Sequence, residues 1–172
     1  MERRSTAVRG FRRVPLALAA LLLLWPAPAA LAGGYAALDG VKGLDTVFDV
    51  SQGSPKMANV VFWAVRDVYR DETVRSLPNP PHTVVVFHGP AVRLISSERK
   101  WFKPEEIPEV EKFAETVREM KKEGVTFEIC MYAAKVMGVD PATVMPEIDR
   151  VGNGFVSVAG YQARGYSVVR IP

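Results

Sequence analysis

The chain has 172 residues and a formal net charge of +3, from 22 basic and 19 acidic side chains. Residues 1–32 hold five of the arginines and one acid, which leaves 17 basic and 18 acidic side chains from Gly33 on and a net charge of −1. This balance excludes the basic surface by which nucleic-acid-binding proteins are recognised. The 140 residues from Gly33 to the end are enough for one ordinary domain with a real hydrophobic core.

Residues 1–32 are predicted to be a signal peptide. Arginines precede an apolar run from Val14 to Trp25, and Ala30-Leu31-Ala32 fits a cleavage site of small residues. The apolar core is shorter than the roughly 20 residues of a membrane-spanning helix, which favours cleavage over a retained anchor. Arg12-Arg13 resembles a twin-arginine signal only weakly, so Sec export is at least as well supported. We expect a periplasmic or extracytoplasmic location, with membrane attachment only if the leader stays uncleaved.

The rest of the chain is predicted to be one α/β domain, residues 44–172, preceded by a flexible segment at 33–43 that is rich in glycine and alanine. A buried strand is expected at 46–50. Ser54-Pro55 then predicts a helix to about Arg70, because serine caps helices and proline favours the first helical position. The inward residues of this helix are expected to be Val60, Trp63, Ala64 and Val68.

The strongest strand signal is the run Thr83-Val84-Val85-Val86-Phe87. Its continuous apolarity indicates burial on both faces, as in a parallel sheet. His88-Gly89-Pro90 follows the carboxyl end of this strand, and a short helix is expected at 91–95. The polar stretch from Arg93 to Lys103 is interpreted as a solvated loop, with a partner surface or a lid as the alternative.

The second half of the chain continues the alternation of helix and strand. A helix is expected to begin near Lys103-Pro104, with an apolar face made by Ile107, Val110, Phe113, Ala114, Val117 and Met120. A strand at 125–129 leads to Cys130, and a helix follows it as far as Gly138. A short fourth strand is expected within 147–151. The small acidic group of Asp140, Glu147 and Asp149 is interpreted as a solvated face.

The segment from Asn153 to Arg164 is predicted to be a helix capped by Asn153. A strand at 155–159 is the rejected alternative, because the residues before the last strand, 166–171, would be too few for a parallel crossover.

This alternation predicts about five mostly parallel strands with helices on both faces. Right-handed crossovers and a flavodoxin-like order would put the strand at 46–50 in the centre, flanked by those at 83–87 and 125–129. Sites in such sheets lie outside the carboxyl ends of the strands. Ser51-Gln52-Gly53, His88-Gly89 and Cys130 are expected to converge there, with His82 at the opposite end of its strand.

Cys130 is the only cysteine of the chain, and it lies where a strand pattern gives way to a helical pattern. Unpaired amides and the helix dipole at such a junction favour thiolate over thiol. A thiolate can attack a sulfane sulfur and carry it as a persulfide, or form a mixed disulfide, without a metal. The alternatives are a buried thiol that packs as a small hydrophobe and a disulfide between molecules.

His88 is a candidate assisting group for this thiol. In the expected strand order, two spacings of about 4.8 Å separate it from Cys130, so both side chains would have to lean across the sheet. The simpler interpretation is a strand-end residue that bonds its own loop, and no oriented acid for a triad is evident. The two histidines lie at opposite strand ends and no phosphate-binding glycine motif is present, so we expect no metal site and no cofactor.

Several segments together resemble the DsrE/DsrF-like family, and the resemblance covers about Val47 to the end of the chain. The matching segments are 84–90 with Val92 and Leu94, 124–130, 151–154, Tyr161-Gln162 and Gly165-Tyr166. The resemblance implies a flavodoxin-like three-layer α/β/α fold and homo-oligomers, commonly trimers or hexamers. In the sulfur-relay members of the family, a cysteine after the third strand carries transferred sulfur, and Cys130 occupies that position.

Two features of this sequence differ from the sulfur-relay members of the family, which are cytoplasmic. The predicted export signal would make the sulfur donor and acceptor, whether proteins or small sulfane-sulfur compounds, components of the envelope. Met131-Tyr132-Ala133-Ala134 also lacks the polar residues often found beside the cysteine of exported relatives. Two hypotheses follow: an envelope sulfur-handling protein with a persulfide on Cys130, or a non-catalytic oligomeric binding module in which Cys130 is structural and the loop from Arg93 to Trp101 meets a partner.

Overall fold

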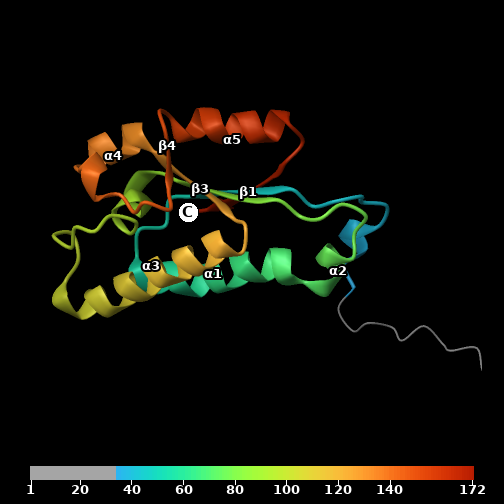
Figure 1. The fold of residues 1–172 in the computed structure, drawn as a ribbon, viewed down its shortest axis with the longest axis horizontal. Helices are drawn as coiled ribbons and strands as arrows, with labels where there is room; N and C mark the ends of the chain where they lie inside the picture. The colour runs from blue at the N-terminus through green and yellow to red at the C-terminus, as the bar shows by residue number, and fades with distance from the viewer. Residues whose placement is uncertain (1–33) are drawn as a thin grey trace, which may run out of the picture. The chain divides into compact units, whose positions relative to one another are not determined.

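A parallel five-stranded sheet forms the middle layer of the computed structural model, which describes residues 34–172 (Figure 1). The predicted signal peptide lies outside the described residues. The strand order is β4-β3-β2-β1-β5. The strands are β1 (Thr46–Val50), β2 (Thr83–Phe87), β3 (Thr126–Cys130), β4 (Asp149–Val151) and β5 (Ser167–Ile171).

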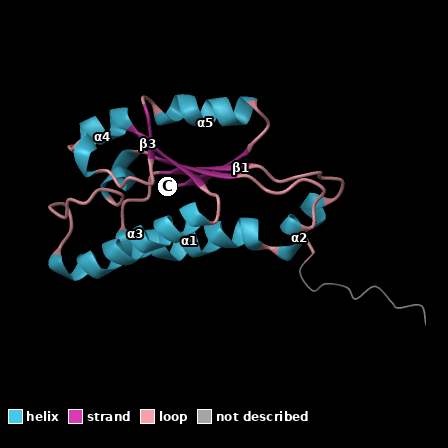
Figure 2. Cartoon of the chain, viewed as in Figure 1, coloured by secondary structure: helices cyan, strands magenta, loops and turns pink. Residues whose placement is uncertain are grey.

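Helices cover both faces of the sheet, as Figure 2 shows. One face carries α1 (Pro55–Arg70) and α3 (Ile107–Lys122), with the short α2 (Glu72–Arg75) at the end of α1; the other carries α4 (Met131–Met137) and α5 (Gly154–Ala163). This arrangement confirms the three-layer α/β/α prediction and the helix predicted from Asn153. Within residues 34–172, no helix combines the length and the apolar character that crossing a membrane requires.

The predicted strand order is wrong in its centre. β2 is the middle strand, between β1 and β3, and β1 lies between β2 and β5. All five residues of β2 are buried, as expected for a strand with neighbours on both sides and helices on both faces. The chain adds β2, β3 and β4 successively on one side of β1, and then returns through α5 to place β5 on the other side.

The inward face of α1 also differs from the prediction, although the helix begins at Pro55 and ends at Arg70 as expected. Its buried residues are Pro55, Ala58, Phe62 and Val65. Val60 and Trp63, which were predicted to face inward, are 59% and 74% exposed, and Ala64 is exposed as well. Of the four predicted residues, only Val68 packs against the core, where it is partly buried. The helix has two apolar stripes, and periodicity alone does not decide which of them packs on the sheet.

Aromatic packing decides the orientation of α1. The Phe62 ring stacks on Phe87 of β2 with centroids 5.8 Å apart and meets Phe113 of α3 edge-on at 4.7 Å. The ring of Phe127 of β3 is also stacked with Phe87, with centroids 6.0 Å apart. All four rings are fully buried, so turning α1 to bury Trp63 would dismantle the centre of the core. The predicted apolar face of α3 is confirmed, with Ile107 half-buried and the rest buried.

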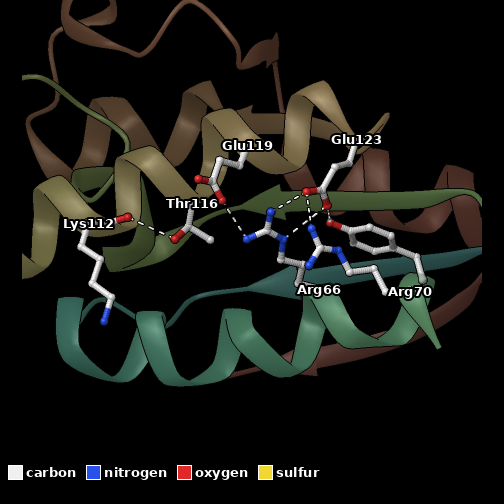
Figure 3. Close-up of polar contacts among 7 residues, drawn as sticks. Arg66, Arg70, Lys112, Thr116, Glu119 and Glu123 are labelled. Carbon is white, nitrogen blue, oxygen red and sulfur yellow. Dashed lines mark hydrogen bonds and ion pairs between the residues drawn. The ribbon is translucent and has the colours of Figure 1, made fainter.

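A charged cluster joins the outer sides of α1 and α3 (Figure 3). Glu123 accepts hydrogen bonds from Arg66, from Arg70 at 2.5 Å and from the Tyr69 hydroxyl at 2.5 Å. Arg66 also pairs with Glu119 at 2.8 Å. Burial raises the pKa of Glu123, but the hydrogen bonds from Arg66, Tyr69 and Arg70 outweigh that effect and lower this pKa to about 2.

We expect Glu123→Gln to remove part of the acid sensitivity of the fold. A carboxyl whose pKa falls from 4.5 to about 2 on folding stabilises the protein above pH 4.5, and that contribution is lost as the pH drops toward 2. The free energy of unfolding, measured with urea between pH 5 and 2, should therefore fall less steeply for the variant than for the wild type. Glu105→Gln, at an exposed position just before α3, should keep the wild-type slope. Equal slopes for all three proteins would contradict this account.

Candidate functional site

The structure brings Cys130 and His88 to the same edge and the same face of the sheet. Asp49 of β1 pairs with Val86 of β2, which pairs with Glu128 of β3. Val86 packs with residues of α5, and side chains two positions apart on a strand share a face. His88 and Cys130 therefore follow on the α5 side of adjacent strands. The prediction that two strand spacings separate them is wrong, because β2 and β3 are neighbours.

Cys130 is enclosed rather than open. The residue is 3% exposed, and its Sγ accepts a hydrogen bond from the Ala133 amide at 3.4 Å, which makes it the N-cap of the short helix α4. The start of α5 covers it: a Cβ added at Gly154 would lie 2.9 Å from Cys130 Cβ and 3.2 Å from Val86 Cγ1. A glycine is therefore required where α5 crosses the thiol.

Two hydrogen bonds hold the start of α5, one from a side-chain cap and one between backbone groups. Asn153 caps α5 by accepting a hydrogen bond from the Phe155 amide at 3.0 Å, as the sequence predicted. The Tyr132 amide at the start of α4 donates to the Gly152 carbonyl at 3.1 Å. The second of these hydrogen bonds joins the start of α4 to the turn before α5.

His88 is paired with an acid that the sequence analysis missed. Its Nε2 lies 2.5 Å from Oδ1 of Asp49, and the two side chains are only 11% and 15% exposed. Neither atom has a hydrogen-bond partner among the described residues, so the contact is a close ion pair whose angles do not suit a hydrogen bond. The His88 ring also packs against Phe155 of α5, with centroids 5.2 Å apart. The oriented acid that seemed absent is therefore Asp49, and its signal was a carboxylate within an otherwise apolar buried strand.

A second buried carboxylate holds α5 over the site. Glu128 of β3 is 8% exposed and accepts hydrogen bonds from the hydroxyls of Ser157 and, at 2.8 Å, Tyr161. Burial raises the pKa of Tyr161, and its hydrogen bond to the Glu128 carboxylate raises it further, to about 12. Both hydroxyls therefore act as donors at neutral pH. The sequence analysis also missed this contact, for which Glu128 within a buried strand was the signal.

The other predicted residues lie as follows. His82 is at the opposite end of β2, where Nδ1 meets the Tyr166 hydroxyl at 2.5 Å, which confirms that it is remote from Cys130. Gly53 packs on Pro90, so the turns after β1 and β2 do converge. Among residues 34–172, no group of three His, Cys, Asp or Glu side chains could hold a metal ion.

The polar loop after β2 is more closely packed than a solvated connection. Trp101 is half-buried against the core, with Arg93 and Lys100 over its ring at 5.6 and 4.7 Å. Arg99 pairs with Glu111 of α3 at 2.8 Å. The acidic group beyond α4 is likewise partly paired, since Glu147 and Asp149 each lie 3.6 Å from a basic side chain of α3.

We expect Gly154→Ala to destabilise the protein, because its new methyl group would overlap Cys130 and Val86. Overpacking of this kind typically costs about 1–3 kcal/mol, measured as the free energy of unfolding in urea. Gly160→Ala in the same helix is the matched control. It meets nothing within 4 Å, and removing a helical glycine should stabilise by roughly 0.5–1 kcal/mol. A Gly154→Ala protein as stable as the wild type would show that α5 does not press on Cys130.

Two solved structures are similar to this chain. One is a protein of unknown function, MTH1491 from Methanobacterium thermoautotrophicum, with 18% identity, a TM-score of 0.57 and coverage of 74% of this chain and 98% of that one. The other is the ychN protein from E. coli, with 13% identity, a TM-score of 0.49 and coverage of 76% and 99%. At 18% identity, the first likeness establishes the fold alone. No curated protein sequence matches the chain.

The family is established by sequence. The model of the DsrE/DsrF-like family matches residues 47–171, which begins in β1 and ends with β5 and so includes every strand of the sheet. The chain therefore belongs to the DsrE/DsrF-like family, and this membership suggests a role related to sulfur relay.

Proposed function

We propose that this protein carries sulfane sulfur as a persulfide on Cys130 in the bacterial envelope. The observation that carries the proposal is the place of its only cysteine, at the carboxyl end of β3 and on the face that holds the Asp49–His88 pair, in a family linked to sulfur relay. The export signal predicted at residues 1–32 supports the envelope location. The partners would be a donor and an acceptor of sulfane sulfur, and the protein would act as a trimer or hexamer.

The transfer is a displacement at sulfur. The Cys130 thiolate attacks the outer sulfur of a donor persulfide, R–S–SH. A new S–S bond forms on Cys130 while the S–S bond of the donor breaks, and the donor leaves as the thiolate R–S⁻ with that electron pair. Cys130 then bears S–SH, with no net oxidation and no metal. The same step in reverse, with an acceptor thiolate as the attacking group, delivers the sulfur.

His88 is the proposed assisting group, and Asp49 is its positioning residue. A rotation of the His88 ring that lets Nε2 donate its hydrogen to the adjacent Asp49 would fix the tautomer and leave Nδ1 as the nitrogen that accepts a proton. His88 would take the proton of the thiol before attack and return it to the departing thiolate. This role requires Cys130 and His88 to approach within hydrogen-bond reach as the site opens.

The burial of Cys130 is the observation that favours the alternative hypothesis, a non-catalytic binding module. At 3% exposure the Sγ atom is closed to a donor, so carriage requires the segment Asn153–Phe155 to move away from it. If that segment does not open, Cys130 is a core residue and the protein is a non-catalytic oligomeric binding module. Access to the thiol in the folded protein therefore separates the two functions.

We expect the wild-type protein to gain one sulfur mass after exposure to polysulfide and removal of excess reagent, as measured by intact mass spectrometry. Reductant should reverse the gain, and Cys130→Ser should show none. The reaction should also be faster than that of a model thiol, because the site activates the thiolate. A folded wild-type protein that gains no sulfur, and whose thiol is labelled only after unfolding, would overturn the carrier function and support the binding module.

We expect His88→Gln to slow persulfide formation about 100-fold, the usual contribution of a general base. Asp49→Asn should slow it by about tenfold, the lower end of the effects seen for groups that orient another side chain. The diagnostic measurement is the pH dependence of the rate between pH 5 and 9, which His88→Gln should change because it removes the imidazole, whereas Asp49→Asn, which keeps the imidazole, should change it less. Variants that fold and keep the wild-type rate and pH profile would remove the Asp49–His88 pair from the mechanism.

A further inference from the structure

The side of α1 that faces away from the sheet carries an apolar stripe. Met57, Val60 and Trp63 are 46%, 59% and 74% exposed, and Ala64 beside them is exposed as well. Residues at these spacings are neighbours on one face of a helix. Scattered exposed apolar residues are ordinary, but a contiguous stripe centred on a tryptophan is typical of a protein interface.

Trp63 stands between two hollows of suitable size for a side chain. One, of about 420 Å³, lies between α1 and α3 and is lined by Val60, Asn59, Lys56 and Lys112 among others. The other, of about 310 Å³, lies between α1 and the segment before β1, with Leu38, Leu44 and Val68 in its lining. Because the Trp63 side chain lies between two hollows, this surface can interlock with a second copy of itself.

The charges at the two ends of the stripe are opposite. Lys56 lies four residues before Val60, and Asp67 lies four residues after Trp63, so both share the face of the stripe. Neither forms an ion pair with another residue of the described part of the chain. The arginines of the same helix differ, because Arg66 and Arg70 turn toward α3 and bind its glutamates (Figure 3).

We propose that this face of α1 binds the same face of a second copy of the chain, with the two helices antiparallel about a twofold axis between Val60 and Trp63. This arrangement sets Lys56 of each copy against Asp67 of the other, and Val60 of each copy against Trp63 of the other. A twofold contact forms every such pair twice. A parallel arrangement would instead oppose Lys56 to Lys56 and Asp67 to Asp67, so the charges select the antiparallel pair.

The same register places each indole ring at the larger hollow of the other copy. Lys56 and Lys112 line that hollow, and an ammonium group over an indole face is favourable. The contact lies on the face of the sheet opposite to α4 and α5, as Figure 1 shows, so it leaves the cover of Cys130 free. The inference is independent of the sulfur chemistry, and of the two assemblies proposed above it requires the hexamer, in which twofold contacts join two trimers.

The test measures self-association by sedimentation equilibrium over a range of protein concentrations. Lys56→Glu and Asp67→Lys should each raise the dissociation constant of the twofold contact at least tenfold, because each creates two pairs of like charges. The double variant Lys56→Glu/Asp67→Lys restores opposite charges and should return to within about threefold of the wild type. Lys135→Glu, an exposed charge reversal on α4, should leave the contact unchanged.

Trp63→Ser should weaken the contact at least 100-fold, because it removes the central side chain of the interface, while circular dichroism should show a wild-type fold. If the wild type is a hexamer, this variant should sediment as a trimer. The proposal is overturned if the wild type is a monomer or an odd-numbered oligomer, if Trp63→Ser associates like the wild type, or if the double reversal fails to restore association. If the wild type is a monomer, the exposed stripe of α1 would instead be a binding surface for a different protein.

Discussion

Both faces of the sheet must be covered, because β2 at its centre is apolar and buried along its whole length. The two covers differ in character. On the α1 and α3 side, four phenylalanine rings interlock within the larger of the two apolar clusters, which also reaches α4. On the α5 side the apolar cluster is small, comprising Val47, Val84, Val86 and Tyr166, and two carboxylates lie among the strand residues. The α1 and α3 side therefore contributes most of the buried apolar surface. The α5 side contains Asp49, His88 and Cys130, the side chains that could take part in a reaction.

The carboxylates on the α5 side explain how a helix with little apolar packing is held in place. A buried charge is unfavourable without partners, and Glu128 obtains them from two hydroxyls of α5, whereas Asp49 obtains one from His88. The element that closes over Cys130 is thus fixed largely by polar contacts. Water can replace such contacts when α5 moves, whereas it cannot replace the aromatic packing of the opposite layer. This difference makes an opening at Cys130 compatible with an intact core.

The layered arrangement also separates the surface of the proposed assembly from the site of the proposed sulfur chemistry. The exposed stripe of α1 and the enclosed thiol lie on opposite faces of the sheet, so a contact between copies through α1 does not compete with access to Cys130. The same aromatic packing that turns Phe62 inward turns Trp63 outward, since the two residues are adjacent in one helix. The packing of the core therefore exposes Trp63, the centre of the surface at which we propose that a second copy binds.

The sequence by itself determined the succession of elements and the family. Local signals such as the serine and proline at the start of α1, the apolar run of β2 and the asparagine before α5 act within a few residues, so they could be interpreted without the fold. Only the tertiary structure decided the strand order, the inward side of α1 and the pairing of His88 with Asp49, because each depends on which distant segments pack together. The place of Cys130 after β3 was predictable, but its enclosure by Gly154 was not, since residues 24 positions apart in the chain meet only once α5 crosses the sheet.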